Sequence, residues 1–178
     1  PRRLGLPRRR PMPPEDGVQD VDWVVGACQL LRSDTVRSVG PMDERIFMWY
    51  DDAEWCLRMA KAGWRRVVAR NAVCVHHERK SAGELPPLRV SLQVSMSEYT
   101  YFRLHFGRLP TAAIWSLRTF YSVAKVVVLA PAALVTAGRV GPIIGLLQLN
   151  WGRLRFHIRH AADILWREPR AYRAEDLT

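Results

Sequence analysis

Residues 42–81, MDERIFMWYDDAEWCLRMAKAGWRRVVARNAVCVHHERKS, decide the fold that we expect for this chain. A helix is predicted over 51–62, because acids occupy its first turn, basic residues occupy its last turn and Gly63 follows as a stop. Two short strands are predicted after it, over 64–69 and 72–77. The segment therefore predicts an α/β unit, and it also holds the main candidates for chemistry.

The flanking segments complete the predicted fold. A strand is expected over 22–32, in which Gly26 marks a bulge or a close backbone approach. A short helix over 33–40 follows, with Ser33 as its cap and Gly40 as its stop. The remaining pattern is helical, and the expected helices cover 88–106, 110–137 and 142–167.

Composition divides the chain into three segments. Residues 1–20 are a basic, Pro- and Arg-rich loop, 21–84 are the α/β unit, and 85–178 are a basic, apolar helical region. With 178 residues, 48% hydrophobic composition and seven Trp, the chain is long and apolar enough for a real core. Residues 1–14 lack the apolar centre of a signal peptide, and we expect the chain to be a piece of a longer protein.

The charge is strongly positive and unevenly placed. A net charge of +10 favours anionic partners, such as nucleic acid, anionic lipid or phosphorylated substrates. No acid lies between Glu98 and Asp163, although many Lys and Arg residues do. The basic head, PRRLGLPRRR, could bind nucleic acid. No nucleic-acid-binding module accompanies it, so we expect a solvated or lipid-facing loop and no nucleic-acid partner.

Two patterns resemble metal ligands and are better explained in other ways. DVD at 20–22 follows a loop and opens a strand, whereas the DxD of nucleotide-sugar enzymes closes an apolar strand, so we do not assign a metal to it. The cysteines Cys28, Cys56 and Cys74 lack metal-ligand spacing and lie in apolar patterns. Buried, reduced thiols in a cytoplasmic protein are therefore expected.

The apolar stretch 114–149 raises the question of a membrane span. Its uncharged run, 126–138, is shorter than the roughly 20 residues that a spanning helix needs, and Pro131 interrupts it. We expect an interfacial or re-entrant helical pair, apolar on one side and rich in arginine on the other. A true span and an ordinary core are the alternatives.

Three acids, Asp51, Asp52 and Glu54, crowd the start of the helix predicted over 51–62. Exposed amides and the helix dipole favour ionised carboxylates there. An ionised carboxylate can take a proton from a hydroxyl nucleophile. Helix capping is the alternative role, although the repulsion between the acids argues against a pure cap. Glu54 and Arg58 are four residues apart and can also pair.

Two histidines, His76 and His77, end the strand predicted over 72–77, so their side chains point to opposite faces. Only one of them can face a site shared with the acids. A surface role is usual at a strand end, but neutral imidazole is also a common ligand for divalent metals. The acids and one His could together complete a metal-diphosphate site.

Residues 21–81, about a third of the chain, resemble the second half of bacterial family 2 glycosyltransferases, in particular the rhamnosyltransferase-like group. The family pattern is W-x-x-G-A, then G-G-F-D-E-x-F-F-x-Y-x-E-D-x-D-L-x-x-R, then a Gly before an aromatic residue, then a strand that ends in His before a Ser. This sequence follows it in order with WVVGA, GPMDERIFMWYDDAEWCLR, GW and VHHERKS. Pro41 and Met42 depart from the usual Gly-Phe. The acidic motif with Trp nearby is also similar to the galactofuranosyltransferase branch, so the sugar stays open.

The resemblance implies a role for each matching residue. Asp52 takes the place of the general base, and Asp51 and Glu54 take the acidic positions beside it. His76 matches the metal- and diphosphate-facing His, and His77 is the weaker candidate. The remaining matches are the acceptor-side motif, Trp23, Gly26 and Ala27, and the structural support, Asp43, Glu44 and Arg58.

The resemblance also implies a fold class, α/β: a partial GT-A type, Rossmann-like domain that lacks its nucleotide-binding half, followed by a helical carboxy-terminal region. The implied enzyme is an inverting transferase of the hexosyltransferase class. It would transfer a sugar from a nucleotide-sugar donor to a lipid-linked (polyprenyl-linked) or cell-wall glycan acceptor. Its divalent metal, Mg or Mn, would be bound mainly through an upstream DxD, so these residues alone are expected to be inactive or nearly so.

The basic tail YFRLHFG and the apolar helices after it resemble the membrane-associated end of such enzymes. The implied location is the cytoplasmic face of the cell membrane, with peripheral or shallow insertion at an anionic surface. The alternative function is a non-catalytic, basic membrane-binding or scaffold module. Such a module would bind lipid without depending on Asp52, His76 or a nucleotide sugar.

Overall fold

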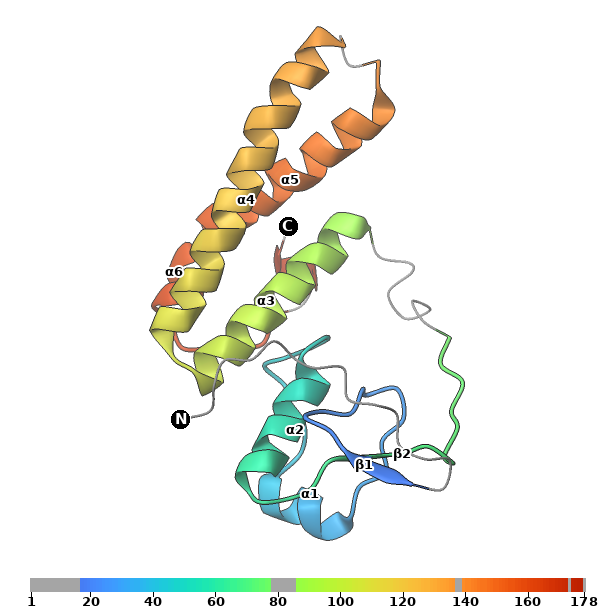
Figure 1. Cartoon of the computed structure of the whole chain (residues 1–178). Coiled ribbons are helices and arrows are strands. Elements are labelled where there is room, and N and C mark those ends of the chain that lie inside the picture. The colour runs from blue at the N-terminus through green and yellow to red at the C-terminus, as the bar shows by residue number, and fades with distance from the viewer. Residues whose placement is uncertain (1–16, 78–85, 137–138, 173, 178) are drawn as a thin grey trace, which may run out of the picture.

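The structure is a computed structural model that describes residues 17–77, 86–136, 139–172 and 174–177. A small α/β unit is followed by a helical part (Figure 1). In chain order the elements are β1 (Val18–Asp20), α1 (Ser33–Val39), α2 (Asp51–Lys61), β2 (Val67–Ala69), α3 (Pro87–His105), α4 (Arg108–Val135), α5 (Gly141–Arg159), α6 (Ala161–Leu165) and the 3₁₀ helix η1 (Ala174–Leu177). Most of the expected basic loop and the expected boundary at 84 lie outside the described residues.

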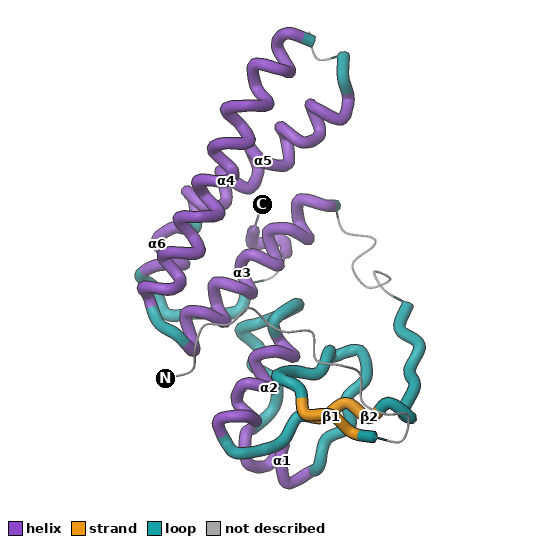
Figure 2. The backbone as a smooth tube through the Cα atoms, viewed as in Figure 1, coloured by secondary structure: helices purple, strands orange, loops and turns teal. Residues whose placement is uncertain are grey.

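The sheet pairs two strands from opposite ends of the α/β unit. β1 and β2 run antiparallel, with Val18 opposite Ala69 and Asp20 opposite Val67 (Figure 2). The N–H of Val21 extends the pairing by donating to the oxygen of Arg66 at 2.9 Å. The strand predicted over 64–69 is thus confirmed for its last three residues.

The strand expected over 22–32 is wrong, because this segment is a loop that lies against α2. The N–H of Val24 donates to Cys56 Sγ at 3.5 Å, and the side-chain amide of Gln29 donates to the Val24 oxygen at 2.6 Å. Backbone groups that a strand would offer to a neighbouring strand are thereby satisfied by side chains.

The strand expected over 72–77 is also wrong. These residues form no strand and all are exposed. Val73 and Val75 are 85% and 77% exposed, so the apolar side chains that suggested a strand are not buried against anything. A strand is stable only when a neighbour pairs with it and one face is covered, and neither condition is met here among the described residues.

Both helices expected in the α/β unit are confirmed. α1 ends at Gly40, whose φ of 78° lies in the left-handed region that favours glycine. α2 is followed by Gly63, with φ of 84°. The expected cap is wrong, because Arg32 occupies the cap position without a side-chain cap bond and Ser33 is the first helical residue.

The helical part follows the prediction with one break. α3 and α4 confirm the expected helices over 88–106 and 110–137. The third expected helix is divided into α5 and α6 at His160, whose φ of −96° and ψ of 9° depart from helical values. The His160 ring is buried and lies 5.0 Å from the Phe156 ring, centroid to centroid. Packing of this ring accompanies the turn that returns the chain toward α3.

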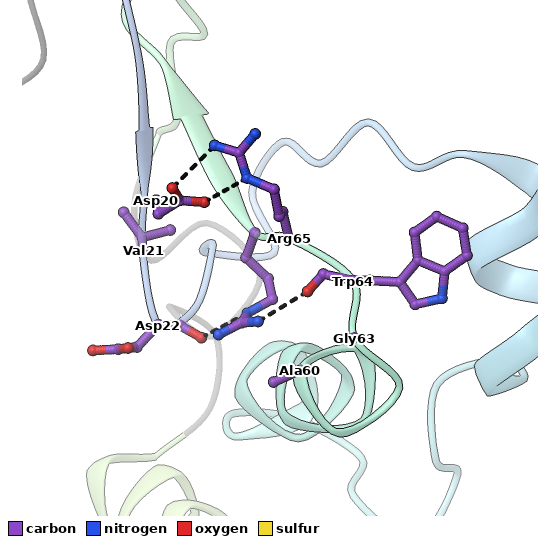
Figure 3. Close-up of a pocket in the computed structure, with 8 residues that line it drawn as sticks. Asp20, Val21, Asp22, Ala60, Gly63, Trp64 and Arg65 are labelled. Carbon is purple, nitrogen blue, oxygen red and sulfur yellow. Dashed lines mark hydrogen bonds and ion pairs between the residues drawn. The ribbon is translucent and has the colours of Figure 1, made fainter. Parts of the chain in front are cut away.

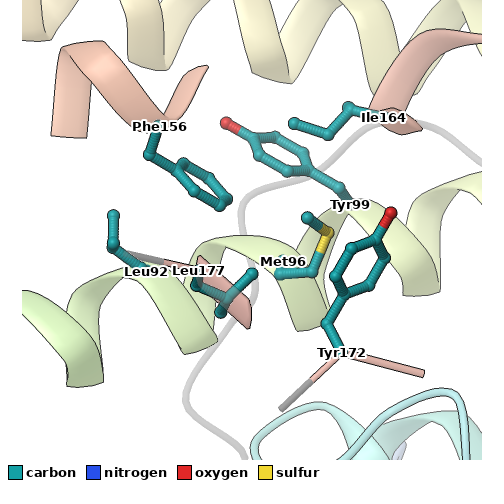
Figure 4. Packing of buried hydrophobic residues seen from close by; sticks show 7 residues of the cluster. All are labelled: Leu92, Met96, Tyr99, Phe156, Ile164, Tyr172 and Leu177. Atoms are coloured by element: carbon teal, nitrogen blue, oxygen red, sulfur yellow. The ribbon is translucent and has the colours of Figure 1, made fainter. Parts of the chain in front are cut away.

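One apolar cluster holds the helical part together (Figure 4). Its side chains come from α3, α5, α6 and the segment through η1. They are Leu92, Met96, Tyr99, Phe156, Ile164, Tyr172 and Leu177, and none is more than 7% exposed. Burial of each large apolar side chain contributes about 1.5–3 kcal/mol, so this cluster fixes α3 against α5 and α6.

α4 and α5 form an antiparallel hairpin that extends away from the α/β unit (Figure 1). The hairpin buries polar side chains such as Thr111 and Ser122. Its outward residues on α4 are large and apolar: Leu117, Phe120, Val127, Val128, Leu134 and Val135. Among the described residues, α4 is the one helix whose length and composition would let it cross a membrane, and little of it is buried.

The cysteine prediction is only partly correct. Cys56 on α2 is buried, whereas Cys28 and Cys74 are exposed because both lie in loops rather than in the expected strands. The neighbouring Cys28 thiol raises the pKa of the Cys74 thiol. The segment after β2 therefore returns to the loop that follows Gly26.

Two glycines of α5 predict opposite effects on stability when replaced by alanine. A Cβ at Gly152 would lie 2.6 Å and 2.9 Å from the methyl groups of Leu88, whereas none of the residues that the structure describes lies within 4 Å of a Cβ at Gly145. Gly145→Ala should stabilise by about 0.5–1 kcal/mol through helix propensity. Gly152→Ala should be less stable than Gly145→Ala by about 1–3 kcal/mol because the site is overpacked. Urea unfolding of both variants measures the difference, and equal stabilities would contradict the close α3–α5 contact.

Candidate active site

The candidate acids follow a strained turn. Trp49 and Tyr50 have φ of 61° and 66°, a left-handed conformation that costs of order 1–3 kcal/mol in a residue other than glycine. α3 holds this turn in place. Ser97 Oγ donates to the Met48 oxygen at 2.6 Å, and the Tyr50 hydroxyl donates to Glu98 Oε1 at 2.8 Å. The turn thus sets the direction in which α2 begins.

Asp52 contacts the expected acceptor-side loop. The N–H of Gly26 donates to Asp52 Oδ2 at 2.8 Å, and the N–H of Ala53 donates to Asp52 Oδ1 at 2.7 Å. A Cβ at Gly26 would lie 3.4 Å from the Cβ of Asp52, which is ordinary van der Waals contact, so the loop packs closely on Asp52. Asp52 is only partly buried, which leaves its carboxylate within reach of a substrate.

The remaining residues of the loop lie on the surface beside this contact. Trp23 is 54% exposed, and Ala27 is also exposed. The structure therefore brings Gly26 directly to Asp52 and places Trp23 and Ala27 on the same loop.

Asp51 differs from Asp52 in its surroundings. Asp51 is partly buried, and burial raises the pKa of its carboxyl; the charge of Asp52 beside it raises that pKa further. Burial thus makes the Asp51 carboxyl harder to ionise than an ordinary aspartate.

Glu54 lies away from Asp51 and Asp52, and the catalytic role implied for it needs correction. It is 1% exposed and accepts hydrogen bonds from Arg58 Nε at 2.8 and 3.0 Å and from His105 Nε2 at 3.0 Å. Lys61 Nζ lies 3.1 Å from the other ring nitrogen of His105. Burial lowers the pKa of His105. Glu54 therefore joins α2 to the end of α3 and does not face a substrate.

Asp43 and Arg58, the residues expected to give structural support, both bind other groups of the α/β unit. Arg58 donates to the backbone oxygens of Val39 and Pro41 as well as to Glu54, so it fixes the turn after α1. Asp43 binds Arg45 through both carboxylate oxygens, and this hydrogen bonding lowers the pKa of Asp43. Glu44, by contrast, is exposed.

The two histidines are not gathered with the acids. His76 and His77 are exposed in the irregular segment after β2. Among the residues that the structure describes, no three His, Cys, Asp or Glu side chains are placed to hold a metal ion together. No chemical step of this chain is derived through the divalent metal that the resemblance implies, which would be held mainly by an upstream DxD.

Sequence reasoning missed the residues of α3 and α4 that hold the acids. Tyr50, Ser97 and Glu98 position the turn, and Arg118 Nε binds Glu98 Oε2 at 2.5 Å. Burial and the Glu98 carboxylate raise the pKa of Tyr50 to about 12. The sequence held one signal that could have pointed to Glu98, because Glu98 is the last acid before a long basic stretch.

A separate hollow lies beside β1 at the other end of α2 (Figure 3). Its volume is about 320 Å³, and Ala60 and Gly63 form its α2 side. Arg65 binds both carboxylate oxygens of Asp20, at 2.9 and 3.0 Å. Since Asp52 begins α2 and Gly63 follows its end, this hollow is not part of the acid site.

Comparison with known proteins indicates one class of enzyme. The chain is 31% identical over 104 residues to the N-acetylglucosaminyl-diphospho-decaprenol L-rhamnosyltransferase of two Mycobacterium tuberculosis strains. Over this match the chain is similar to a rhamnosyltransferase. The match covers 58% of this chain, and the chain covers 34%, about a third, of the length of these relatives. No model of a protein family and no solved structure matches the chain.

Proposed function

We propose that this chain supplies the acceptor-side part and the general base of an inverting family 2 glycosyltransferase. The contact between the Gly26 N–H and the accessible Asp52 carboxylate carries this proposal, because it joins the two motifs on which the resemblance rests. The partial match to a rhamnosyltransferase supports the same class of enzyme. Rhamnose is therefore the first donor sugar to test, with galactofuranose as the alternative.

In the proposed reaction, Asp52 takes the proton from a hydroxyl group of the acceptor. The hydroxyl oxygen attacks the anomeric carbon of the donor sugar, and the bond to the nucleoside diphosphate breaks, which inverts that carbon. The Gly26 N–H holds one carboxylate oxygen in place. Asp51, whose pKa burial raises, lies beside the base without replacing it.

The donor side of the reaction is assigned to a nucleotide-sugar-binding half of the GT-A type in the whole protein. A Mg or Mn ion bound mainly by that half would neutralise the departing diphosphate. We accordingly propose that these 178 residues alone turn over little or no donor. The described α/β unit, with its two-stranded sheet, would be only part of such a domain.

The acceptor is proposed to be lipid-linked, and the place of reaction is the cytoplasmic face of the cell membrane. The name of the mycobacterial relative specifies an N-acetylglucosaminyl-diphospho-decaprenol acceptor. The α4–α5 hairpin supports a membrane location, since α4 exposes many large apolar side chains and buries the polar Thr111 and Ser122. A soluble helical hairpin has the opposite arrangement, so peripheral or shallow insertion explains the exposed face of α4.

The test is sugar transfer by the whole protein that contains this chain. A nucleotide-rhamnose donor and a lipid-linked N-acetylglucosaminyl diphosphate acceptor should give a rhamnosylated lipid, detected by mass spectrometry. Replacement of the donor by nucleotide-galactofuranose distinguishes the two sugars. Absence of transfer from either donor, with the protein folded and membrane-bound, would overturn the proposed function.

A non-catalytic membrane-binding module is the second candidate, favoured by the exposed apolar face of α4. Such a module would bind anionic vesicles with the same affinity after Asp52→Asn and would require no nucleotide sugar. Vesicle binding without transfer would therefore support it over the enzyme.

A further inference from the structure

Two arginines lie partly buried between α3, α4 and α5, and one of them, Arg118, binds a carboxylate. Arg118 Nε donates to Glu98 Oε2 at 2.5 Å, and its Nη1 lies 3.5 Å from Ser95 Oγ. Arg153 Nε donates to Ser91 Oγ at 2.7 Å, a neutral partner. Ser91, Ser95 and Glu98 follow each other at intervals of about one turn, so they share one face of α3.

The charge of this cluster is not balanced by the described residues. Burial lowers the pKa of the Arg153 guanidinium, and the charge of Arg118 lowers it further, while Tyr121 has the opposite effect. Burial and both arginines lower the pKa of His157 to about 4, so its ring is neutral at pH 7. Two guanidinium charges against Glu98 leave one positive charge in excess. A partly buried cation without a counter-ion is unfavourable, which favours an anion at this place.

The donor groups suit an oxyanion. A guanidinium carries five N–H donors in a fixed, planar arrangement that matches carboxylate and phosphate oxygens. Among the described residues, no acceptor is bonded to the two terminal nitrogens of Arg153, and its Ser91 partner engages only Nε. The Arg118 side chain is 37% exposed, so an anion can enter from solvent.

The cluster is joined to the segment of the candidate base through Glu98 and Tyr50. Glu98 accepts from the Tyr50 hydroxyl at 2.8 Å on one oxygen and from Arg118 on the other. Tyr50 directly precedes Asp51 and Asp52. A ligand whose anionic group contacts the arginines would therefore extend along Tyr50 toward the acids.

We propose that Arg118 and Arg153 form a binding site for a phosphate or diphosphate group. The role of this site rests on the proposed function: it would hold the diphosphate of a lipid-linked acceptor while Asp52 meets the sugar hydroxyl. Charge-assisted hydrogen bonds from guanidinium to phosphate supply the affinity. The hydroxyl groups of Ser91 and Ser95 orient the two arginines toward the ligand.

Calorimetric titration of the 178-residue chain with inorganic pyrophosphate, at constant ionic strength, tests the site. Arg153→Gln should weaken binding about tenfold or more, because a charged donor pair is lost. Arg155→Gln removes an exposed arginine from the same helix and should leave the affinity within about twofold. Arg153→Lys keeps the charge without the planar donor pair and should give an intermediate affinity, which also controls for a folding defect.

Further binding measurements identify the source of the anion. Equal binding of a short prenyl diphosphate and of pyrophosphate would assign the site to the diphosphate itself. Binding to phosphatidylglycerol vesicles without pyrophosphate binding would overturn the diphosphate site. If Arg153→Gln and Arg155→Gln weakened the affinity for pyrophosphate equally, the bound pyrophosphate would be an adventitious ion only. Asp52→Asn should bind pyrophosphate as the wild type does, so loss of transfer with retained binding separates the base from this site.

Discussion

Asp52→Asn should reduce the turnover number of the whole transferase by about 10²–10⁴-fold, the range typical of general acid–base catalysis. The amide side chain has nearly the shape of the carboxylate, and its oxygen can still accept from the Gly26 N–H. The loop and the acceptor contacts should therefore remain, so KM should change little. Two things are lost: the ability to take a proton from the acceptor hydroxyl, and the second carboxylate oxygen, which accepts from the Ala53 N–H. Steady-state transfer of rhamnose to the lipid-linked acceptor measures both constants.

Asp34→Asn is the matched control for this experiment. Asp34 is an exposed acid near the start of α1, in the same α/β unit, and pairs with Arg37 on the surface. Its replacement removes one negative charge without touching the candidate site, and the turnover number should stay at the wild-type value. Wild-type turnover in Asp52→Asn would show that another group is the base. A fall in both variants would indicate a general charge effect.

Glu54→Ala should destabilise the chain by about 3–5 kcal/mol, because loss of one partner leaves buried charge uncompensated. Arg58 would lose its carboxylate while its other nitrogens stay bound to backbone oxygens. His105 would lose its acceptor at the contact between α2 and α3. Urea unfolding, followed by circular dichroism, measures the change in the free energy of unfolding.

Two variants control for this effect. Glu44→Ala removes an exposed acid from the same unit and should change stability by no more than about 0.5 kcal/mol. Glu54→Gln keeps an acceptor oxygen for Arg58 or His105 and should lie between the alanine variant and the wild type. A loss below about 1 kcal/mol in Glu54→Ala would contradict the stabilising role of this network.

The separation of Asp52 from Glu54 shows where motif reasoning was incomplete. Residues two positions apart on a helix point about 200° apart around its axis. The two acids therefore cannot face the same site once residues 51–61 are helical. Helix geometry alone would have divided the acidic motif into an exposed half and a buried half. Only the packing of α3 decides that Glu54 is the buried one.

Local patterns predicted the helices because their signals act over a few residues. Glycine stops, acids in a first turn and long apolar runs indicated α1 to α4 closely. The strands were predicted less well, because a strand depends on a partner far away in the sequence. Residues 22–32 and 72–77 have strand composition, yet side chains of α2 bind the first, and among the described residues no strand pairs with the second.

By itself, the sequence determined the helices, the positive charge and the order of the motifs that resemble a glycosyltransferase. Tertiary structure decided which side chains meet: Gly26 with Asp52, Glu54 with His105, and Arg118 with Glu98. The physical reason is the distance along the sequence over which each kind of interaction acts. Helix propensity and charge are properties of neighbouring residues, whereas these contacts join residues between 20 and 51 positions apart and exist only after the helices have packed.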